Sequence, residues 1–391
     1  MKNLLIIIAI MAGSSVFAQN SVDRALRSVE QNNTALKALK EEIDAQKLEN
    51  KTGIYLPNPE VEFNYLWGNP NNIGNRNDIA VSQTFDFATI TGMKRKIANK
   101  RNSLLELQYK SESLNVMLQA RQYCVDLIYY NALKRELDLR LEHAATLADG
   151  YKNRLEKGDA NILEYNKVQL NLAAVKGEMS SLETERKSAL AELKRLNGGV
   201  AVPVDDSEYP DVSLPDNFDE WFAQAEQKNP VLEYVKQEVE IAKNQVSLNR
   251  ATSLPSLSAG FMREKVVGEA YQGISLGISI PLWENRNRVK QAKAAVKASE
   301  AKQEDSRLQF YEYLKNLYER TKGLEATAND YKQSLSSLNS TGLLKKALDA
   351  GEISLLDYIV EIGLYYNTVN LRLEAEREFQ KTLAEILNFE F

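Results

Sequence analysis

Short stretches in which apolar and polar residues alternate occur twice in each half of the chain. They lie at about residues 58–67 and 78–87 in the first half, and at about 256–264 and 272–282 in the second. Alternation with a period of two predicts strands with one apolar face and one mostly polar face. Strands of about 9 to 11 residues with this pattern suit a transmembrane barrel, which presents its apolar face to lipid. Hairpins packed on the helices of a water-soluble protein show the same alternation and remain an alternative.

The first predicted strand has side chains suited to the lipid-facing side of such a barrel and others suited to its lumen. Tyr65 and Trp67 suit the aromatic belt at a membrane interface. On the polar face, Glu60 and Glu62 are candidates for lining the barrel lumen, whereas the corresponding strand of the second half carries serines. Two carboxylates on a polar face are weak indicators of what passes through a pore.

Long charged stretches follow each pair of predicted strands. No proline interrupts residues 93–151, and a continuous helix of that span would extend on the order of 90 Å. The second half repeats this pattern over residues 287–350. Apolar residues recur there at spacings of three, four and seven, as in Leu314, Leu317, Leu324, Tyr331 and Leu335, which predicts a coiled-coil seam. Taken alone, these helices would equally describe an exported helical rod.

The order of elements is repeated about 197 residues along the chain, which indicates two matched halves rather than a short-period solenoid. The stretch Glu30–Leu36 reappears as Glu226–Leu232, and a Leu-Pro pair ends the helical pattern in both halves. Each copy reads as helix, two strands, long helix, tight glycine turn and helix. Two structural repeats are therefore predicted.

The repeats define the expected domain organisation. The first repeat covers residues 19–197 with a helical tip at about 152–162, and the second covers 218–391 with a tip at about 347–355. A linker at 198–217 joins them. Glycine at each tip is suited to the positive φ that ends a helix tightly.

Residues 1–18 have the features of a secretory signal peptide. Lys2 provides a basic start, residues 4–11 are apolar, and Val16-Phe17-Ala18 offers small residues before Gln19. An N-terminal anchor helix is the alternative, although the apolar run is well below the length of about 20 residues that a membrane span needs. The mature chain is expected to be exported.

Composition narrows the functional classes. The net charge is −5 and no basic patch stands out, so nucleic acid is not an expected partner. Cys124 is the only cysteine and His143 the only histidine, so neither an internal disulfide nor a clustered metal site is expected. We expect no cofactor. The chain has no glycine-rich phosphate loop and no nucleophile motif, so it is not expected to be an enzyme.

Four strands are too few to close a barrel with a lumen. A bilayer does not tolerate an open sheet edge, because each unpaired backbone group costs several kcal/mol in hydrocarbon. A membrane-inserted form must therefore oligomerise. Three copies with four strands each would give a barrel of about twelve strands, which is wide enough for a passage.

The order of several short motifs, together with the duplication, resembles the TolC family of outer-membrane efflux proteins. These motifs are Leu56-Pro57-Asn58-Pro59, Val81-Ser82-Gln83-Thr84-Phe85-Asp86, the turn from Arg154 to Gly158, Asn229-Pro230, Leu254-Pro255 and Ile280-Pro281-Leu282-Trp283. The resemblance implies a mainly α fold with a small β part, in a homotrimer whose twelve-stranded barrel lies in outer-membrane lipid. It also implies a helical tunnel in the periplasm.

The resemblance further implies a function. The protein would be a passive exit duct for small molecules or metal ions, working with a periplasmic adaptor protein and an inner-membrane pump of the resistance-nodulation-division type. An exported periplasmic coiled-coil protein without a barrel is the alternative function. The sequence leaves the cargo open, because a duct need not bind what it conducts.

Site residues follow from the resemblance at the helical tips. The residues expected to contact the adaptor are Arg154, Leu155, Gly158, Asn161 and Ile162 in the first repeat, and Ala347, Leu348, Gly351 and Ser354 in the second. Candidate carboxylates for the tunnel entrance are Asp159, Asp349 and Glu352. A solvated tip surface is the alternative for the carboxylates, and a favourable interaction with the helix dipole is the alternative for Arg154.

Overall fold

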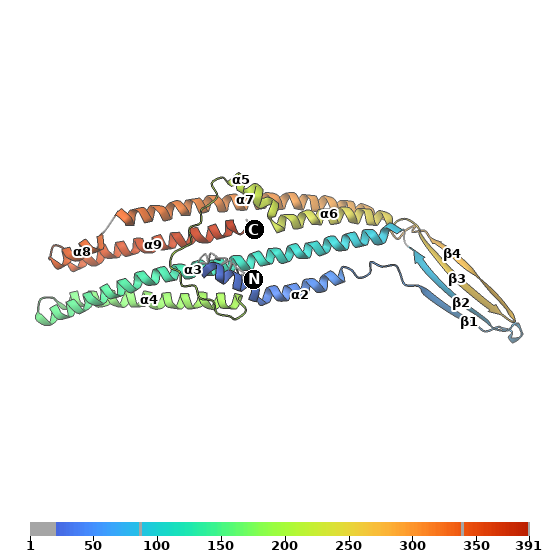
Figure 1. The fold of residues 1–391 in the computed structure, drawn as a ribbon, viewed down its shortest axis with the longest axis horizontal. Coiled ribbons are helices and arrows are strands. Elements are labelled where there is room, and N and C mark those ends of the chain that lie inside the picture. Colours follow the sequence, from blue (N-terminus) through green and yellow to red (C-terminus); the bar gives the residue numbers. More distant parts are fainter. Residues whose placement is uncertain (1–20, 86–87, 338–339, 390–391) are drawn as a thin grey trace, which may run out of the picture. The chain divides into compact units, whose positions relative to one another are not determined.

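A computed structural model describes residues 21–85, 88–337 and 340–389 of the chain. The mainly helical fold with two β-hairpins predicted from the sequence is confirmed (Figure 1). The predicted signal peptide lies outside the described residues. The elements, in chain order, are α1 (Ser21–Asn32), α2 (Thr34–Glu49), β1 (Glu60–Leu66), the 3-10 helix η1 (Asn71–Ile73), β2 (Arg76–Phe85), α3 (Ala88–Lys157), α4 (Ile162–Leu196), α5 (Phe218–Lys228), α6 (Pro230–Ala251), β3 (Ser256–Val266), β4 (Glu269–Ser279), α7 (Arg288–Ser337), α8 (Ser340–Asp349) and α9 (Leu355–Leu387).

The strand ends differ from the predicted ones by a few residues. The second hairpin turn consists only of Val267 and Gly268, with φ values of 22° and 85°, so β3 and β4 both continue further into the turn than expected. β4 ends at Ser279, before Pro281, because proline has no amide hydrogen to donate to the ladder. β2 begins two residues earlier than expected, because Arg76 already pairs with Leu66 of β1 and with Val266 of β3.

The chain forms two compact units that do not coincide with the two predicted repeats. Unit 1 contains residues 116–214 and 319–385 together with the N-terminal part up to Thr34, and unit 2 contains residues 35–115, 215–318 and the C-terminal end. Each unit therefore combines segments from both repeats. The helical tips belong to unit 1 and all the described strands to unit 2.

Unit 1 is held together by contacts of α3 with α4 and α9. Tyr129 packs on Val369 and Leu373, while a second cluster near the tips joins α3, α4 and α9. The buried Arg140 guanidinium lies 4.5 Å from the Tyr366 ring centroid and donates to Asn370 Oδ1 at 2.8 Å. A cation stacked on an aromatic ring and bonded to a side-chain amide fixes α9 to α3 at one rotation.

The linker between the repeats is anchored on α3 over its unit 1 part. Asn131 Nδ2 donates to the carbonyls of Val204 and Asp206 at 2.9 and 2.8 Å. Tyr209 donates its hydroxyl hydrogen to the carbonyl of Val125 at 3.1 Å. Because the linker has no regular structure, the two bonds from Asn131 satisfy linker carbonyls that a helix or a sheet would otherwise satisfy, and the Tyr209 bond ties the linker to the α3 backbone.

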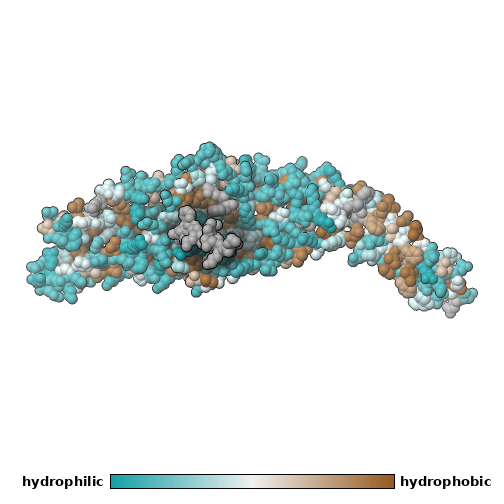
Figure 2. All heavy atoms as spheres, viewed as in Figure 1, coloured by the Kyte–Doolittle hydropathy of each residue, from teal (hydrophilic) through white to brown (hydrophobic). Residues whose placement is uncertain are grey.

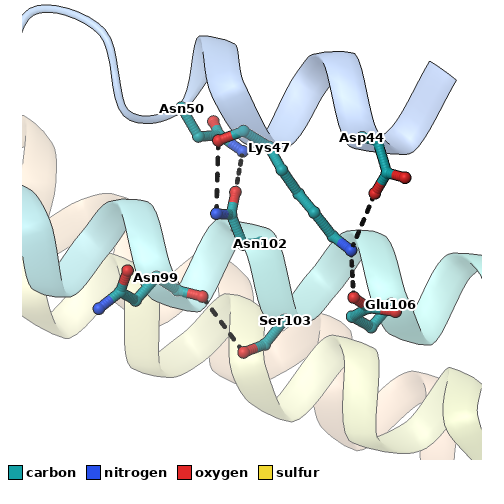
Figure 3. A network of polar contacts seen from close by, with 7 residues as sticks. All are labelled: Asp44, Lys47, Asn50, Asn99, Asn102, Ser103 and Glu106. Atoms are coloured by element: carbon teal, nitrogen blue, oxygen red, sulfur yellow. Dashed lines mark hydrogen bonds and ion pairs between the residues drawn. The ribbon is translucent and has the colours of Figure 1, made fainter. Parts of the chain in front are cut away.

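In unit 2, polar and aromatic side chains fix the helices that precede the strands. Asn50 Nδ2 donates to Asn102 Oδ1 at 2.9 Å, and Lys47 of α2 forms an ion pair with Glu106 of α3 (Figure 3). On α5, Phe218 and Phe222 pack against aromatic rings of α7, at centroid distances of 4.9 to 5.6 Å from Tyr311 and Tyr318. Among the residues that the structure describes, no helix is long and apolar enough to span a membrane.

The four strands form one antiparallel sheet in the order β1-β2-β3-β4 (Figure 1). The central β2–β3 pair joins the hairpins of the two repeats, with Phe85 opposite Leu257 and Arg76 opposite Val266. β1 and β4 are the edge strands, so each has one side without a strand partner within this sheet.

Candidate functional site

One face of the sheet is covered with exposed apolar side chains. The register places Val61, Val81, Phe261 and Ile274 in one row across the four strands. Ile274 and Leu276 are 81% and 80% exposed, and Figure 2 shows hydrophobic residues gathered over the sheet. A contiguous apolar patch of this kind marks a surface that is covered by lipid or by protein. The exposed apolar residues of this face are Val61, Phe63, Tyr65, Ile79, Val81, Phe85, Leu257, Phe261, Ile274, Leu276 and Ile278.

The apolar band is slanted relative to the strands. On β1 the apolar positions run from Val61 towards the hairpin turns as far as Tyr65 and the exposed Trp67, whereas on β4 they run from Ile274 away from the turns. An exposed Trp283 follows at the other end of the band. Barrel strands tilted by about 35 to 45° produce such a slant, and indole rings at both borders suit membrane interfaces.

The opposite face of the sheet is mostly polar. Glu60 and Glu62 alternate with the apolar side chains of β1, so they lie on this face, as the sequence predicts from alternation. Sequence analysis missed the ion pairs beside them, in which Arg76 Nε lies 3.0 Å from Asp78 Oδ1 and 3.2 Å from Glu264 Oε1. Finding the pair with Glu264 requires the register between β2 and β3, whereas Asp78 lies two residues from Arg76 on the same strand.

Both helical tips have the same backbone turn. Gly158 and Gly351 have φ values of 81° and 75°, which favour glycine over other residues. At both tips the glycine amide donates to a carbonyl three residues earlier at 3.1 Å, and the following amide donates to a carbonyl five residues earlier at 2.8 Å. This is the Schellman arrangement. The carbonyls belong to Leu155 and Arg154 at the first tip and to Leu348 and Ala347 at the second.

The helix that follows each tip begins with a reciprocal cap. The Glu164 amide donates to Asn161 Oδ1 at 3.0 Å, and the Asn161 amide donates to Glu164 Oε2 at 2.9 Å. At the second tip, the Asp357 amide donates to Ser354 Oγ at 3.2 Å, and the Ser354 amide donates to Asp357 Oδ2 at the same distance. Hydrogen bonds from the Ser354 hydroxyl and amide lower the pKa of the Asp357 carboxyl. Asn161 and Ser354 therefore serve as helix caps.

Arg154 has neighbours of its own at the first tip. Its guanidinium carbon lies 5.0 Å from the Tyr151 ring centroid, and its Nη2 donates to the Asp159 carbonyl at 3.4 Å. The side chain remains exposed while it is held over the turn. Ala347 occupies the equivalent position of the second turn and has no such group.

The three candidate entrance carboxylates lie in two different settings. Asp159 and Glu352 each follow the turn glycine directly, so they occupy equivalent positions, and both are exposed. Asp349 precedes its glycine and is paired with Lys345, whose Nζ lies 2.9 Å from Asp349 Oδ2. The sequence does not distinguish these settings.

A groove near the tips brings some of the predicted residues together. Arg154, Leu348 and Asp349 all line it, whereas the two glycines and the two caps do not. The groove has a volume of about 690 Å³ and lies between α3, α8 and α9 within unit 1. Its remaining lining residues are Glu142, His143, Thr146, Leu147, Gly150, Tyr151, Thr341, Gly342, Lys345, Lys346, Tyr358 and Ile362.

Apolar side chains are exposed on the first turns after both tips. Ile162 and Leu163 are 54% and 67% exposed at the start of α4, and Leu356 and Val360 are 50% and 52% exposed on α9. Of these, sequence analysis identified only Ile162. Leu163 and Leu356 both lie five residues after the turn glycine, so an exposed leucine occupies the same position at both tips.

The only cysteine of the sequence is buried within a helix, and the only histidine contacts a tyrosine hydroxyl. Cys124 is buried in α3, and burial raises the pKa of its thiol to about 12, so almost none of the reactive thiolate forms at neutral pH. His143 is exposed, and its Nδ1 lies 3.0 Å from the Tyr366 hydroxyl.

The chain is similar to known proteins in both sequence and fold. Residues 221–387 match the outer membrane efflux protein family. No curated protein is similar enough in sequence to match the chain. Among solved structures, the CmeC outer membrane channel of Campylobacter jejuni is 15% identical, with a TM-score of 0.71, and the similarity covers 95% of this chain and 85% of that one. The outer membrane protein VceC of Vibrio cholerae is 13% identical over 94% and 96% of the two chains, with a TM-score of 0.73.

A third similar structure is the open state of the MtrE outer membrane channel of Neisseria gonorrhoeae. It is 15% identical over 95% of this chain and 88% of that one, with a TM-score of 0.62. At such identities the similarity shows the fold, and it extends over nearly the whole chain.

Residues 221–387 thus match outer membrane efflux proteins in sequence, and the chain has the TolC-like fold of outer-membrane channels. The sequence match covers residues 221–387, and the similarity in fold extends over nearly the whole chain. The resemblance predicted from the sequence is thereby confirmed, in sequence for residues 221–387 and in fold for the chain. Both the family and the fold are those of channel proteins rather than of enzymes.

Proposed function

We propose that this protein is the homotrimeric exit duct of a tripartite efflux system in the outer membrane. It passively conducts small molecules or metal ions that an inner-membrane transporter delivers through a periplasmic adaptor. The observation that carries the proposal is the four-stranded sheet, which has an exposed apolar face, a mostly polar opposite face and two open edges. A soluble monomer would leave this contiguous apolar face in water, whereas a membrane barrel covers it with lipid.

Closure of the sheet supports a trimer. The outer sides of β1 and β4 leave backbone amides and carbonyls without strand partners in the sheet, and in hydrocarbon these groups require partners. Pairing β4 of one copy with β1 of the next satisfies both edges. Three copies give about twelve strands, with Glu60 and Glu62 lining the lumen and the apolar band facing lipid.

We place the adaptor contact at the helical tips. In addition to the residues expected from the sequence, the exposed Leu163 and Leu356 give each tip an apolar surface that an adaptor helix can cover. The two tips are not equivalent, because Arg154 adds a cationic donor to the first and Ala347 adds none to the second. A guanidinium can donate to several carbonyls at a helix end of the adaptor.

At the tunnel entrance, we propose that the ring of carboxylates consists of Asp159 and Glu352. Their equivalent and exposed positions would give six carboxylates in a trimer. Asp349 contributes less net charge because Lys345 neutralises it. Rings of carboxylates favour cations at a pore entrance.

The inner-membrane partner follows from the resemblance alone. We propose a pump of the resistance-nodulation-division type, as the TolC family implies. Crosslinking in intact cells, followed by identification of the captured proteins, tests this partner. Recovery of an adaptor from another transporter class instead would refute it.

Fractionation of cells tests the central proposal. We expect a heat-modifiable trimer in the outer-membrane fraction that dissociates into monomers only on boiling in detergent. A protein released from the periplasm without detergent, as a monomer, would refute the proposal. The control is a known outer-membrane porin followed in the same fractions.

A further inference from the structure

Two cationic residues lie on the apolar face of the sheet beside its hairpin turns. Arg263 follows Phe261 by two residues on β3 and therefore projects from the same face, and Lys265 follows at the same spacing. Arg263 lies opposite Ile79 on β2, and Lys265 lies opposite Asn77. Both cations are exposed.

These cations differ from the other basic residue near the turns. Arg76 lies on the opposite face, where it pairs with Asp78 and Glu264. In the part of the chain that the structure describes, the side chains of Arg263 and Lys265 form no ion pair. Glu264, between them in sequence, and Glu269, across the turn on β4, lie on the other face. The outward face therefore carries two positive charges that are not neutralised.

The position of the two cations matches a membrane border. They lie one and two rows beyond the apolar row of Phe261 and Ile274, on the side away from the helices. β3 pairs with strands of its own chain on both sides, so strand pairing with another copy does not cover this surface. With the helices in the periplasm, the turn end of the sheet reaches the outer leaflet.

The spacing of the two cations fits one phosphate group. Side chains two residues apart on a strand start about 7 Å from each other, within the reach of a guanidinium and an ammonium that converge on one anion. Their aliphatic stems can lie along the apolar band while the charged ends stay at the interface. Gln272, opposite Arg263 on β4, adds a side-chain donor.

We propose that Arg263 and Lys265, assisted by Gln272, bind the phosphate group of an acylated, phosphorylated glycolipid of the outer leaflet. The acyl chains of this lipid lie against Phe261, Ile274 and the apolar residues of the same face that are closer to the helices. The inference rests on the proposed function, since only a sheet in the outer membrane presents this face to such a lipid.

The test uses the full-length trimer, purified in detergent, with the double variant Arg263→Gln/Lys265→Gln. Native mass spectrometry measures binding of phosphorylated lipid A and of the same lipid with its phosphates removed. The unmodified trimer should prefer the phosphorylated form, and the double variant should bind it roughly 30-fold more weakly, close to the level of the dephosphorylated lipid. The matched control, Lys290→Gln/Lys293→Gln, removes the same charge from exposed positions of α7 and should bind like the unmodified protein.

Two results would overturn the inference. One is equal binding of phosphorylated lipid A by the unmodified protein and the double variant, and the other is no preference for the phosphorylated form. Fractionation of the same strains separates this failure from failure of the proposed function. Outer-membrane trimers without the lipid preference refute the glycolipid site alone, whereas a soluble periplasmic protein refutes both.

Discussion

The two helical tips share a backbone but differ in their side chains. Both have a positive-φ glycine, the same two turn hydrogen bonds and a reciprocal cap on the next helix. The cap is Asn161 with Glu164 at the first tip and Ser354 with Asp357 at the second. Arg154 at the first tip stands where Ala347 stands at the second. The comparison shows that the repeat maintains the shape of the turn and varies the chemistry displayed on it.

The largest effect is expected from replacing both turn glycines. Gly158→Leu with Gly351→Leu places side chains in open space, since nothing lies within 4 Å of a Cβ at either position, so the effect comes from the positive φ alone. Each turn should lose about 1 to 2 kcal/mol. We expect export to be abolished while the protein stays in the membrane, measured as accumulation of a fluorescent efflux substrate.

The matched control for the turn variants is Gly177→Leu. Gly177 lies within α4, also with open space around a Cβ but without a positive φ. This variant should export normally. Normal export by the double turn variant as well would show that the tip turns do not position the adaptor contact.

The caps should contribute about equally at the two tips. Asn161→Ala and Ser354→Ala should each destabilise the first turn of the following helix by about 1 kcal/mol. Hydrogen exchange of the amides in those turns should become roughly fivefold faster at the altered tip only. The exchanges Asn161→Ser and Ser354→Asn preserve a cap and serve as controls. Acceleration at both tips from one substitution would contradict independent caps.

Removing the Arg154 side chain, which the second tip lacks, tests whether the two tips differ in their contribution to adaptor binding. Arg154→Ala should weaken adaptor binding several-fold, because it removes the donor and its stacking on Tyr151, which is worth about 0.5 to 1 kcal/mol. Surface-immobilised adaptor measures the Kd, and Lys152→Ala removes a neighbouring exposed charge as the control. An unchanged Kd for Arg154→Ala would show that Arg154 does not contact the adaptor and only interacts with the helix dipole.

The smallest effect concerns pH at the second tip. The pKa of Asp357 is lower in the folded protein than in the unfolded chain, so its stabilising effect is present above the unfolded value of about 3.9. The effect is lost as the pH falls through the lower folded pKa. The melting temperature of the protein should therefore approach that of Asp357→Asn below about pH 4. A constant difference between the two at all pH values would contradict this prediction.

Much of the fold can be predicted because the sequence patterns that specify it are local. Alternation identified both faces of β1, and glycines placed both tips. The caps also have a local signature, Asn161 and Ser354 each followed three residues later by an acidic residue, which sequence analysis did not use. The turn at Val267 was harder to place, since a β-branched residue rarely adopts a positive φ.

Features that depend on distant pairing could not be read from the sequence. The ion pairs of Arg76 with Glu264 require the register of β2 against β3. The composition of the compact units likewise depends on which helices pack together, and each unit takes helices from both repeats. Periodicity gives the faces of an element but not the partner that each face meets.

The central β2–β3 pair has a consequence for how the protein is made. Phe85 meets Leu257 across about 170 residues of chain, so the first hairpin emerges during synthesis long before the strand that covers its inner edge. Throughout that interval, β1 and β2 expose both their apolar face and their unpaired backbone to aggregation. We therefore expect biogenesis to include a holding step, in which a chaperone shields the first hairpin until the second half of the chain arrives.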